Sequence, residues 1–153
     1  MSYKKTIIIC ASIHHGNTMK IAKAIGHVIN AKVIKPEDFD LATISDYDLI
    51  GFGSGIYNQK HHKSLFDLVE RLKIQNHQRA FIFSTATVKF LGMHKDLKKS
   101  LNEKGFEIIG EFQCRGFMNY SFTKYLFGGL NKGRPNEADL KNAETFAKEL
   151  ALL

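Results

Sequence analysis

The feature that most constrains the fold of this chain is the regular alternation of short apolar runs with amphipathic segments. Four runs are almost continuously apolar, at residues 6–11, 31–35, 48–54 and 79–85. Such runs are typical of parallel strands that are covered by helices on both faces. A fifth run, 108–117, has a mixed pattern that predicts an edge strand with one face partly wet. On this strand we expect one face to carry Ile108, Gly110, Phe112, Cys114 and Gly116, and the other Ile109, Glu111, Gln113, Arg115 and Phe117.

The segments between these runs have the apolar spacing of helices, with stripes at positions i, i+3, i+4 and i+7. A weaker stripe ends at Gly105, and the last helix has Asn136 as its expected N-cap. The four stripes are Ile21, Ala24, Ile25 and Val28; Leu65, Leu68, Val69 and Leu72; Met93, Leu97 and Leu101; and Leu140, Ala143, Ala147 and Leu150. This alternation predicts an α/β fold with a parallel sheet wrapped on both sides. Ligands of such folds bind at the carboxyl ends of the strands, near the point where the strand order reverses.

Length and composition limit the number of domains. A chain of 153 residues that is 44% hydrophobic, with two prolines, fits one domain over residues 1–153 with a substantial core. The apolar runs are far shorter than the roughly 20 residues of a membrane span. The run after Lys4 and Lys5 is also too short for a signal peptide and leads into His-His-Gly-Asn rather than a cleavage site. We therefore expect a cytoplasmic protein without a membrane span.

The two cysteines of the chain, Cys10 and Cys114, fall on the first and last predicted strands. Two strands would lie between them, at about 4.8 Å per strand, so their separation exceeds the roughly 7 Å limit for a disulfide. We expect both to be buried thiols.

The turn after the first strand has the composition of a phosphate-binding loop. It reads Ser12-Ile13-His14-His15-Gly16-Asn17-Thr18 and opens the amphipathic segment 19–29. The turn offers hydroxyls and amide donors and contains no carboxylate that would repel an anion. Its place at a helix N-terminus adds unpaired N–H groups and the positive end of the helix dipole.

Other phosphate-related functions of α/β folds do not match. A phosphoacceptor receiver domain needs paired acids after its first strand to hold a divalent cation, but the first carboxylate of this chain is Glu37. Neither G-x-x-x-x-G-K-[ST] nor a G-x-G-x-x-G between a strand and a helix occurs. The remaining possibility is a phosphate ligand that is held by backbone amides and hydroxyls.

These residues resemble the flavodoxin family, in particular flavodoxin-like proteins whose phosphate loop carries paired histidines. The resemblance covers the whole chain and is strongest in the loop 12–18, followed by Ala22 and Ile25. Further matching segments are Gly53-Ser-Gly-Ile-Tyr57, Phe83-Ser-Thr85 and residues 129–135. The resemblance implies a flavodoxin-like three-layer sandwich with a five-stranded parallel sheet in the order 2-1-3-4-5. The loop is one residue longer than the usual flavodoxin spacing, and His15 stands where a small residue is expected.

The resemblance also implies FMN as the cofactor, held by three segments. Tyr57 is the expected aromatic that stacks on the flavin ring. Gly55 is the expected pivot of a backbone carbonyl that turns to bond reduced flavin N5, because glycine permits the change in φ. The implied contacts are Ser12, Ile13, His14, Gly16, Asn17 and Thr18 for the phosphate, Ser54, Gly55, Ile56, Tyr57 and Asn58 in a second loop, and Thr85, Ala86 and Thr87 in a third.

Several histidines fall near the expected ligand end, but their spacing does not match a metal site. No H-x-x-x-H or mixed Cys/His spacing occurs, so we expect no metal, and a phosphate contact is the better role for His14. For His61, His62 and His77 we expect exposed polar surface.

The distribution of charge sets expectations about partners. The chain has a net charge of +7 and a pI near 9.4. Three windows without Asp or Glu, 1–36, 49–66 and 112–136, contain the ligand-end loops. We expect a positive rim and an acidic redox partner or an anionic substrate. The scattered lysines form no nucleic-acid reading motif, so nucleic-acid binding is not expected. The cations of these windows are Lys20, Lys60, Lys63, Lys124, Lys132 and Arg134.

Two functions remain open. The chain is a low-potential FMN carrier of electrons between redox proteins, or an FMN-dependent oxidoreductase on a small flat substrate, as in flavodoxin-like protoporphyrinogen oxidases and quinone reductases. The aromatic-rich segment 117–130 is the expected flap or partner surface that distinguishes them. No general acid or base beyond the histidines stands in the expected site, which favours the carrier.

Overall fold

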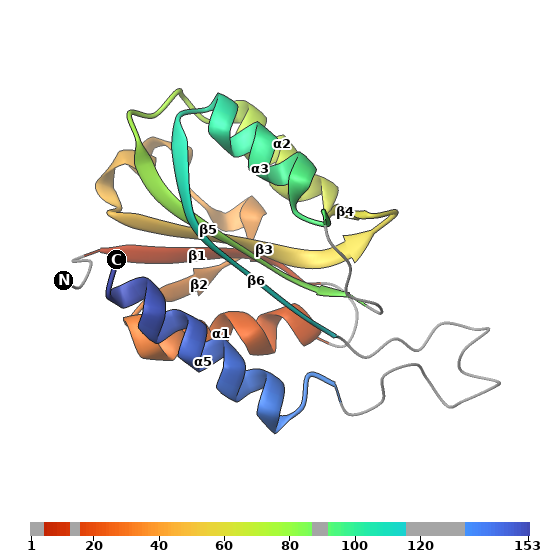
Figure 1. Cartoon of the computed structure of the whole chain (residues 1–153). Helices are drawn as coiled ribbons and strands as arrows, with labels where there is room; N and C mark the ends of the chain where they lie inside the picture. The colour runs from red at the N-terminus through yellow and green to blue at the C-terminus, as the bar shows by residue number, and fades with distance from the viewer. Residues whose placement is uncertain (1–4, 13–15, 87–91, 116–133) are drawn as a thin grey trace.

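The protein is a three-layer α/β sandwich, as the sequence predicts (Figure 1). The computed structural model describes residues 5–12, 16–86, 92–115 and 134–153. A central sheet lies between α1 and α5 on one face and α2 and α3 on the other (Figure 1). The strands are β1 (Thr6–Ala11), β2 (Lys32–Ile34), β3 (Leu49–Tyr57), β4 (Lys60–His61), β5 (Gln78–Ala86) and β6 (Phe106–Arg115). The helices are α1 (Asn17–Ile29), α2 (Lys63–Arg71), α3 (Lys95–Glu103) and α5 (Glu137–Ala151), and the 3₁₀ helices η1 (Pro36–Asp38) and η2 (Leu41–Asp46) join β2 to β3.

The main sheet has the predicted strand order. Five parallel strands run in the order β2-β1-β3-β5-β6, which corresponds to 2-1-3-4-5 when the short β4 is left out of the count. The chain leaves β1 toward β2 on one side and returns to β3 on the other. The strand order therefore reverses between β1 and β3, and their carboxyl ends mark the expected place of a ligand.

Two hydrophobic clusters fill the spaces between the sheet and its helix layers. Alternation along β1 sends Ile7 and Ile9 toward α2 and α3, and Ile8 and Cys10 toward α1 and α5. The helix stripes predicted from the sequence face these clusters. Both cysteines are buried thiols outside any disulfide, as expected, and burial raises the pKa of the Cys10 thiol to about 12.

The predicted faces of the edge strand are wrong at one point. The register of β5 with β6 shifts between Ala80 and Phe81, because β6 carries one extra residue there. Ile108 therefore packs with the α2/α3 cluster, whereas Ile109 and Phe112 pack with the α1/α5 cluster. The period-2 pattern cannot reveal a bulge, since one inserted residue reverses every later side chain. Gly116 and Phe117 lie outside the described residues.

The segment predicted as the second cofactor loop is mostly strand. β3 runs on to Tyr57 and pairs antiparallel with β4, with Tyr57 opposite Lys60. The two residues between them, Asn58 and Gln59, have φ values of 50° and 66°. Positive φ at both central positions is typical of a type I′ hairpin turn. Of the expected loop 54–58, Asn58 lies in the turn, and the other four residues lie in β3.

The predicted helix signals are confirmed at two ends. The Asn136 side chain accepts a hydrogen bond from the Asp139 amide, and Asp139 accepts one from the Asn136 amide, which makes a capping box. Gly105 follows α3 at a φ of 87°, where an added Cβ would collide with the Gln75 backbone. Only glycine fits this termination.

Candidate functional site

The carboxyl edge of the sheet brings most of the expected cofactor residues together. Ser12 follows β1, and Asn17 and Thr18 begin α1. Gly55 of β3 lies directly opposite Thr85 of β5, and Ala86 ends β5. Three expected contacts, Ile13, His14 and Thr87, lie outside the described residues, as does the segment 117–130.

The N-terminus of α1 is suited to an anion. Its N-cap, Gly16, has a φ of 63° and supplies no side-chain cap, and the first turn contains no acidic residue. The Ser12 hydroxyl accepts a hydrogen bond from the Met19 amide at 3.3 Å, so this side chain reaches the same turn. Among the described residues, a Cβ on Gly16 would have no atom within 4 Å, so this part of the chain leaves space at the cap. Helix N–H groups and the helix dipole favour a phosphate in such a place.

A buried hydrogen bond links this helix end to β5. The hydroxyls of Thr18 and Thr85 are 2.7 Å apart, and both side chains are buried. The first and third expected cofactor segments, 67 residues apart in sequence, therefore share a fixed spacing.

The hairpin of β3 and β4 is held by internal hydrogen bonds. The buried Ser54 hydroxyl accepts from the His62 amide at 2.8 Å and donates to the Gly55 carbonyl at 2.6 Å. The Tyr57 ring meets the His62 ring edge to face, with centroids 5.5 Å apart. A Cβ on Gly55 would lie 2.9 Å from the Tyr57 hydroxyl oxygen, so glycine allows this close approach.

A cavity of about 640 Å³ lies beside this hairpin. Its apolar wall includes Tyr57 and the partly buried Phe66, and its other lining residues are polar or charged. They are Asn58, Lys60, His61, His62, Lys63 and Asp67.

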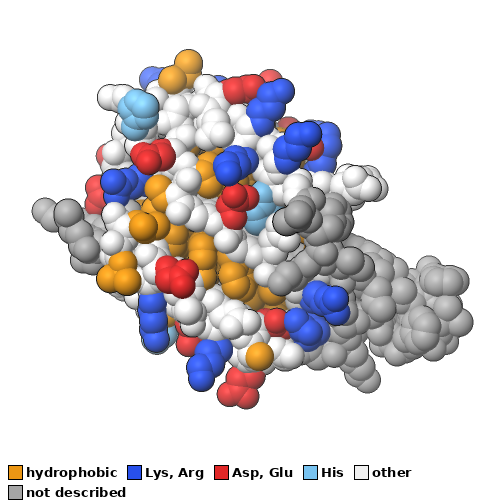
Figure 2. Space-filling view, viewed as in Figure 1, with side chains coloured by type: hydrophobic (Ala, Val, Ile, Leu, Met, Phe, Trp, Pro, Cys, Tyr) orange, Lys and Arg blue, Asp and Glu red, His pale blue; other side chains and the backbone are white. Residues whose placement is uncertain are grey.

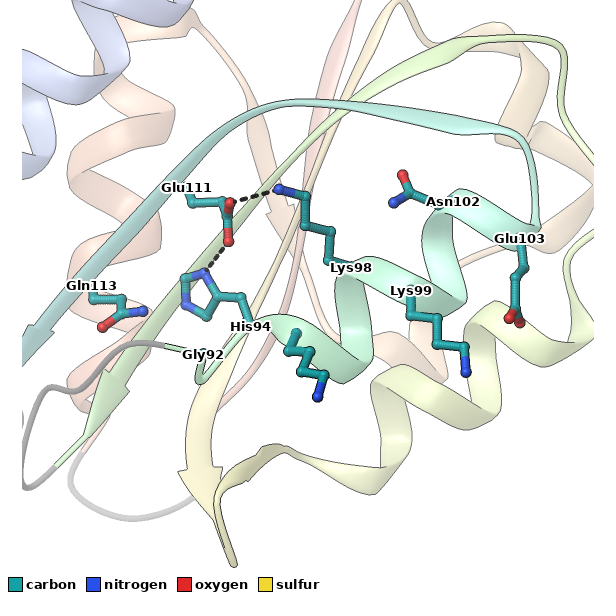
Figure 3. A pocket seen from close by; sticks show the side chains of 9 residues that line it. Gly92, His94, Lys98, Lys99, Asn102, Glu103, Glu111 and Gln113 are labelled. Atoms are coloured by element: carbon teal, nitrogen blue, oxygen red, sulfur yellow. Dashed lines mark hydrogen bonds and ion pairs between the residues drawn. The ribbon is translucent and has the colours of Figure 1, made fainter.

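A buried polar network on the α2/α3 side was missed by the sequence analysis. His94 Nε2 lies 2.7 Å from the Ser84 hydroxyl, and His94 Nδ1 lies 3.0 Å from a Glu111 carboxylate oxygen. The second Glu111 oxygen accepts from Lys98 at 3.2 Å (Figure 3). The His61 ring lies tilted against the His94 ring, with centroids 5.0 Å apart and planes inclined by 49°, and His61 Nε2 lies 3.2 Å from the Phe83 carbonyl oxygen.

The expectation of an exposed His61 is therefore wrong, since only 3% of this residue is exposed. Burial, followed by the charge of His94, lowers the pKa of His61 to about 3. Burial also lowers the pKa of His94, although hydrogen bonding and attraction from Glu111 oppose that shift. One sequence signal was available: Ser84 lies in an apolar strand, where a buried hydroxyl requires a partner.

The expected positive rim is partly neutralised. Lys60 pairs with Asp96 at 3.7 Å, and Lys63 pairs with Asp67 at 2.9 Å. Arg134 pairs with Asp139, and this carboxylate raises the pKa of the guanidinium. Figure 2 shows both signs of charge interspersed on the face that it presents, on either side of a band of hydrophobic side chains. The acids of these pairs lie on α2, α3 and α5, outside the three acid-free windows.

Absences can be stated for the described parts of the chain. Within residues 5–12, 16–86, 92–115 and 134–153, no helix combines the length and the apolar character that crossing a membrane requires. In the same ranges, no three His, Cys, Asp or Glu side chains are grouped so that they could hold a metal ion.

Comparisons with known proteins agree with the fold. A family model described as a flavodoxin domain matches residues 7–121. An uncharacterised protein of Methanocaldococcus jannaschii is 51% identical over 148 residues, which cover 95% of this chain and 97% of the relative. Among solved structures, oxidised flavodoxin 2 from Bacillus cereus superposes with a TM-score of 0.71 at 18% identity, covering 97% of this chain and 98% of the other. A flavodoxin from the domain Archaea gives 0.68 at 18% identity, covering 97% and 96%.

Proposed function

Since this chain belongs to the flavodoxin family, we propose that it binds FMN at the carboxyl edge of its sheet and carries electrons between redox proteins. FMN, when bound, supplies one-electron and two-electron redox chemistry. The residues of the chain supply the binding site, its orientation and its electrostatics.

The observation that carries this proposal is the start of α1. An open N-terminus without an acidic first turn fits the phosphate of FMN, and the Ser12 hydroxyl lies within reach of the same turn. In this proposal the phosphate contacts are Ser12, Ile13, His14, Gly16, Asn17 and Thr18.

The flavin ring would lie between the hairpin of β3 and β4 and the end of β5. Ser54 would contribute through its backbone, because its hydroxyl is engaged with His62 and Gly55. Tyr57 remains the proposed stacking aromatic. In the structure its ring lies close to Gly55, so it would stack on the flavin either from this position or after a change of rotamer. The proposed ring contacts are Ser54, Gly55, Ile56, Tyr57, Asn58, Thr85, Ala86 and Thr87.

A carrier needs a surface that a redox partner recognises. Lys60, Lys63 and Arg134 already have carboxylate partners, which weakens the field that the sequence suggested. Lys20 is exposed on α1, close to the proposed phosphate site. We propose an acidic partner protein that approaches this side of the edge.

One observation favours the second candidate, an FMN-dependent oxidoreductase. The cavity of about 640 Å³ beside Tyr57 and Phe66 is large enough for a small flat substrate. Under that alternative, the purified holoprotein turns over a quinone or a porphyrinogen without another protein.

The test is a visible absorption titration of the purified protein with FMN, followed by stepwise anaerobic reduction. A perturbed flavin spectrum with a distinct one-electron stage supports the carrier. Direct two-electron reduction favours the oxidoreductase, and an unperturbed spectrum of free FMN would overturn both. Riboflavin is the control for the phosphate site, since it presents the same ring without the phosphate.

A further inference from the structure

A chain of polar side chains leads from the surface of α3 into the sheet. Lys98 contacts Glu111 at 3.2 Å, Glu111 contacts His94 at 3.0 Å, and His94 contacts Ser84 at 2.7 Å. In Figure 3, Glu111 points from β6 toward both His94 and Lys98. The side chain of Glu111 is 37% exposed, whereas His94 is 2% and Ser84 0% exposed. The chain of contacts therefore connects solvent to a fully buried hydroxyl.

The inner end of this network lies beside the proposed flavin site. Ser84 immediately precedes Thr85 in β5 and pairs in register with Ser54 of β3. His61 of β4, which pairs with Ile56, lies tilted against the His94 ring. The inner members of the network are thus neighbours, in sequence and in strand register, of residues proposed to hold the flavin ring.

The hydrogen bonds define where His94 can accept a proton. An ionised carboxylate only accepts, so Nδ1–H of neutral His94 donates to Glu111. Nε2 then carries the lone pair and accepts from the Ser84 hydroxyl. A proton added at Nε2 would reverse this bond, with Nε2–H donating to the Ser84 oxygen, and both ring nitrogens of His94 would keep their partners.

His94 is better suited than its neighbour to hold that proton. His61 Nε2–H donates to the Phe83 carbonyl, and its Nδ1 has no hydrogen-bond partner among the described residues. Burial and the proximity of His94 hold the pKa of His61 far below its usual range. Glu111 instead raises the pKa of His94, against the larger effect of burial and the smaller effect of Lys98. The other charged residues that line the cavity beside His94 and Glu111 are Lys95, Lys98, Lys99 and Glu103, all on α3. Lys60 of β4 and Asp96 of α3 form an ion pair with each other.

The same three groups could also be read as a serine nucleophile with its base, because the distances match the geometry of such triads. Ser84 is fully buried in β5 between β3 and β6, and it does not line the cavity of about 490 Å³ that His94 and Glu111 help to form. A nucleophile must reach its substrate, so burial argues against that reading.

We propose that His94 takes up one proton from solvent when the neighbouring FMN is reduced and releases it on reoxidation. This inference rests on the proposed function. The electrons come from the redox partner and pass to the flavin, and the proton binds Nε2 of His94 without any covalent bond of the chain being broken. Negative charge arriving at this edge favours a positive His94, and the Glu111 carboxylate at 3.0 Å from Nδ1 stabilises that charge.

The test is an NMR titration of histidine ring nitrogens in the protein with FMN bound, in the oxidised and in the fully reduced state. We expect the midpoint of the His94 pH titration to rise on reduction by about one pH unit. A shift of this order is what one added negative charge produces, without direct contact, at an effective dielectric constant of about 20. Identical midpoints in the two states would overturn the inference.

Variants separate a redox-linked role from a structural one. Glu111→Gln removes the carboxylate, and we expect the His94 midpoint to fall in both states. Glu107→Gln, an exposed position on the same strand, is the matched control and should leave both midpoints unchanged. Should Glu111→Gln fail to fold, Ser84→Ala keeps the carboxylate and should retain the shift between oxidation states.

Failure of the inference can be told from failure of the proposed function. Flavin absorbance of the same samples reports whether FMN is bound. Bound FMN with an unmoved His94 midpoint overturns the inference alone, whereas no FMN binding overturns both. Covalent labelling of Ser84 by a fluorophosphonate would reveal a nucleophile and would also overturn the assignment.

Discussion

At the carboxyl edge of the sheet, the α1 side presents backbone groups at the start of a helix, whereas the α2/α3 side pairs its polar side chains with one another. On the α1 side, the N-cap Gly16 has no side chain, the first turn of the helix has no acidic residue, and no other described residue occupies the space where a Cβ of Gly16 would lie. On the α2/α3 side, Ser84, His94 and Glu111 satisfy one another inside the protein. One side leaves backbone donors that suit the proposed phosphate, and the other pairs its polar side chains with one another. The difference teaches that an uncapped helix end and a buried polar network can share one sheet edge when they lie on opposite faces.

The largest expected effect is on the side of the buried histidines. The pKa of His61 is about 3 in the folded protein and near 6.5 when unfolded, so the unfolded state binds more protons between these values. The free energy of unfolding should therefore fall as the pH falls from 6.5 toward 3, by up to about 1.4 kcal/mol per pH unit from this group. His94, whose pKa is also lowered, adds to this slope below 6.5.

Chemical denaturation at several pH values measures this slope. His61→Gln should reduce the slope of the unfolding free energy against pH by the contribution of one proton, about 1.4 kcal/mol per pH unit. His27→Gln, on the exposed surface of α1, should leave the slope unchanged. Equal slopes in the wild type and His61→Gln would contradict the burial of a neutral His61.

The next effect tests the α1 side. Gly16→Asp places a carboxylate where the phosphate is proposed, and Asp tolerates the left-handed φ of 63°. We expect FMN affinity to fall by about 100-fold, or about 2.7 kcal/mol, through repulsion between the two anions. Fluorescence titration of FMN measures it.

Gly16→Asn is the matched control for that variant, because it has nearly the same shape without the charge. It should lose much less affinity, and riboflavin should bind Gly16→Asp and Gly16→Asn alike. Similar FMN affinity of the two variants would place the phosphate elsewhere.

A smaller effect is expected from Glu111→Gln on stability. The change weakens the hydrogen bond to buried His94 and the ion pair with Lys98, and should cost about 1–2 kcal/mol, since the carboxylate is partly exposed to solvent. Urea denaturation at neutral pH measures it. Glu107→Gln should change stability by less than about 0.5 kcal/mol. Equal stability of the two variants would show that the network contributes nothing to the fold.

The smallest expected effect concerns the bond between Thr18 and Thr85, which joins the α1 side to β5. Thr18→Val and Thr85→Val should each destabilise the protein by about 1 kcal/mol or more, because each leaves a buried hydroxyl without its partner. The double variant should cost less than the sum, with a coupling of about 1 kcal/mol in a double-mutant cycle. Additive effects would mean that the two hydroxyls do not interact in solution.

Sequence patterns predicted the layers and the helix stripes, because these depend on residues that are close in the chain, whereas the strand order came from the resemblance to the flavodoxin family. β1 matches its predicted range, and Asn136 caps α5 as expected. The hairpin at Asn58 and Gln59 was missed because neither residue is glycine, the usual signal of such a turn. The extra residue in β6 left no local signal either.

Of the candidate site, the sequence placed the proposed phosphate loop between β1 and α1, since strand, turn and helix follow one another directly, and its role in phosphate binding stays a prediction. It could not identify the histidine network, whose members lie on β4, β5, α3 and β6. His61 looked like exposed surface in the sequence and is buried only because β4 folds back on β3.

The sequence by itself determined which segments become strands and helices, because side-chain periodicity and turn composition act over a few residues. The tertiary structure alone decided which polar side chains meet. A bulge fixed the face on which Glu111 lies, and a hairpin carried His61 onto His94. Both depend on register between segments distant in sequence, which no local pattern encodes.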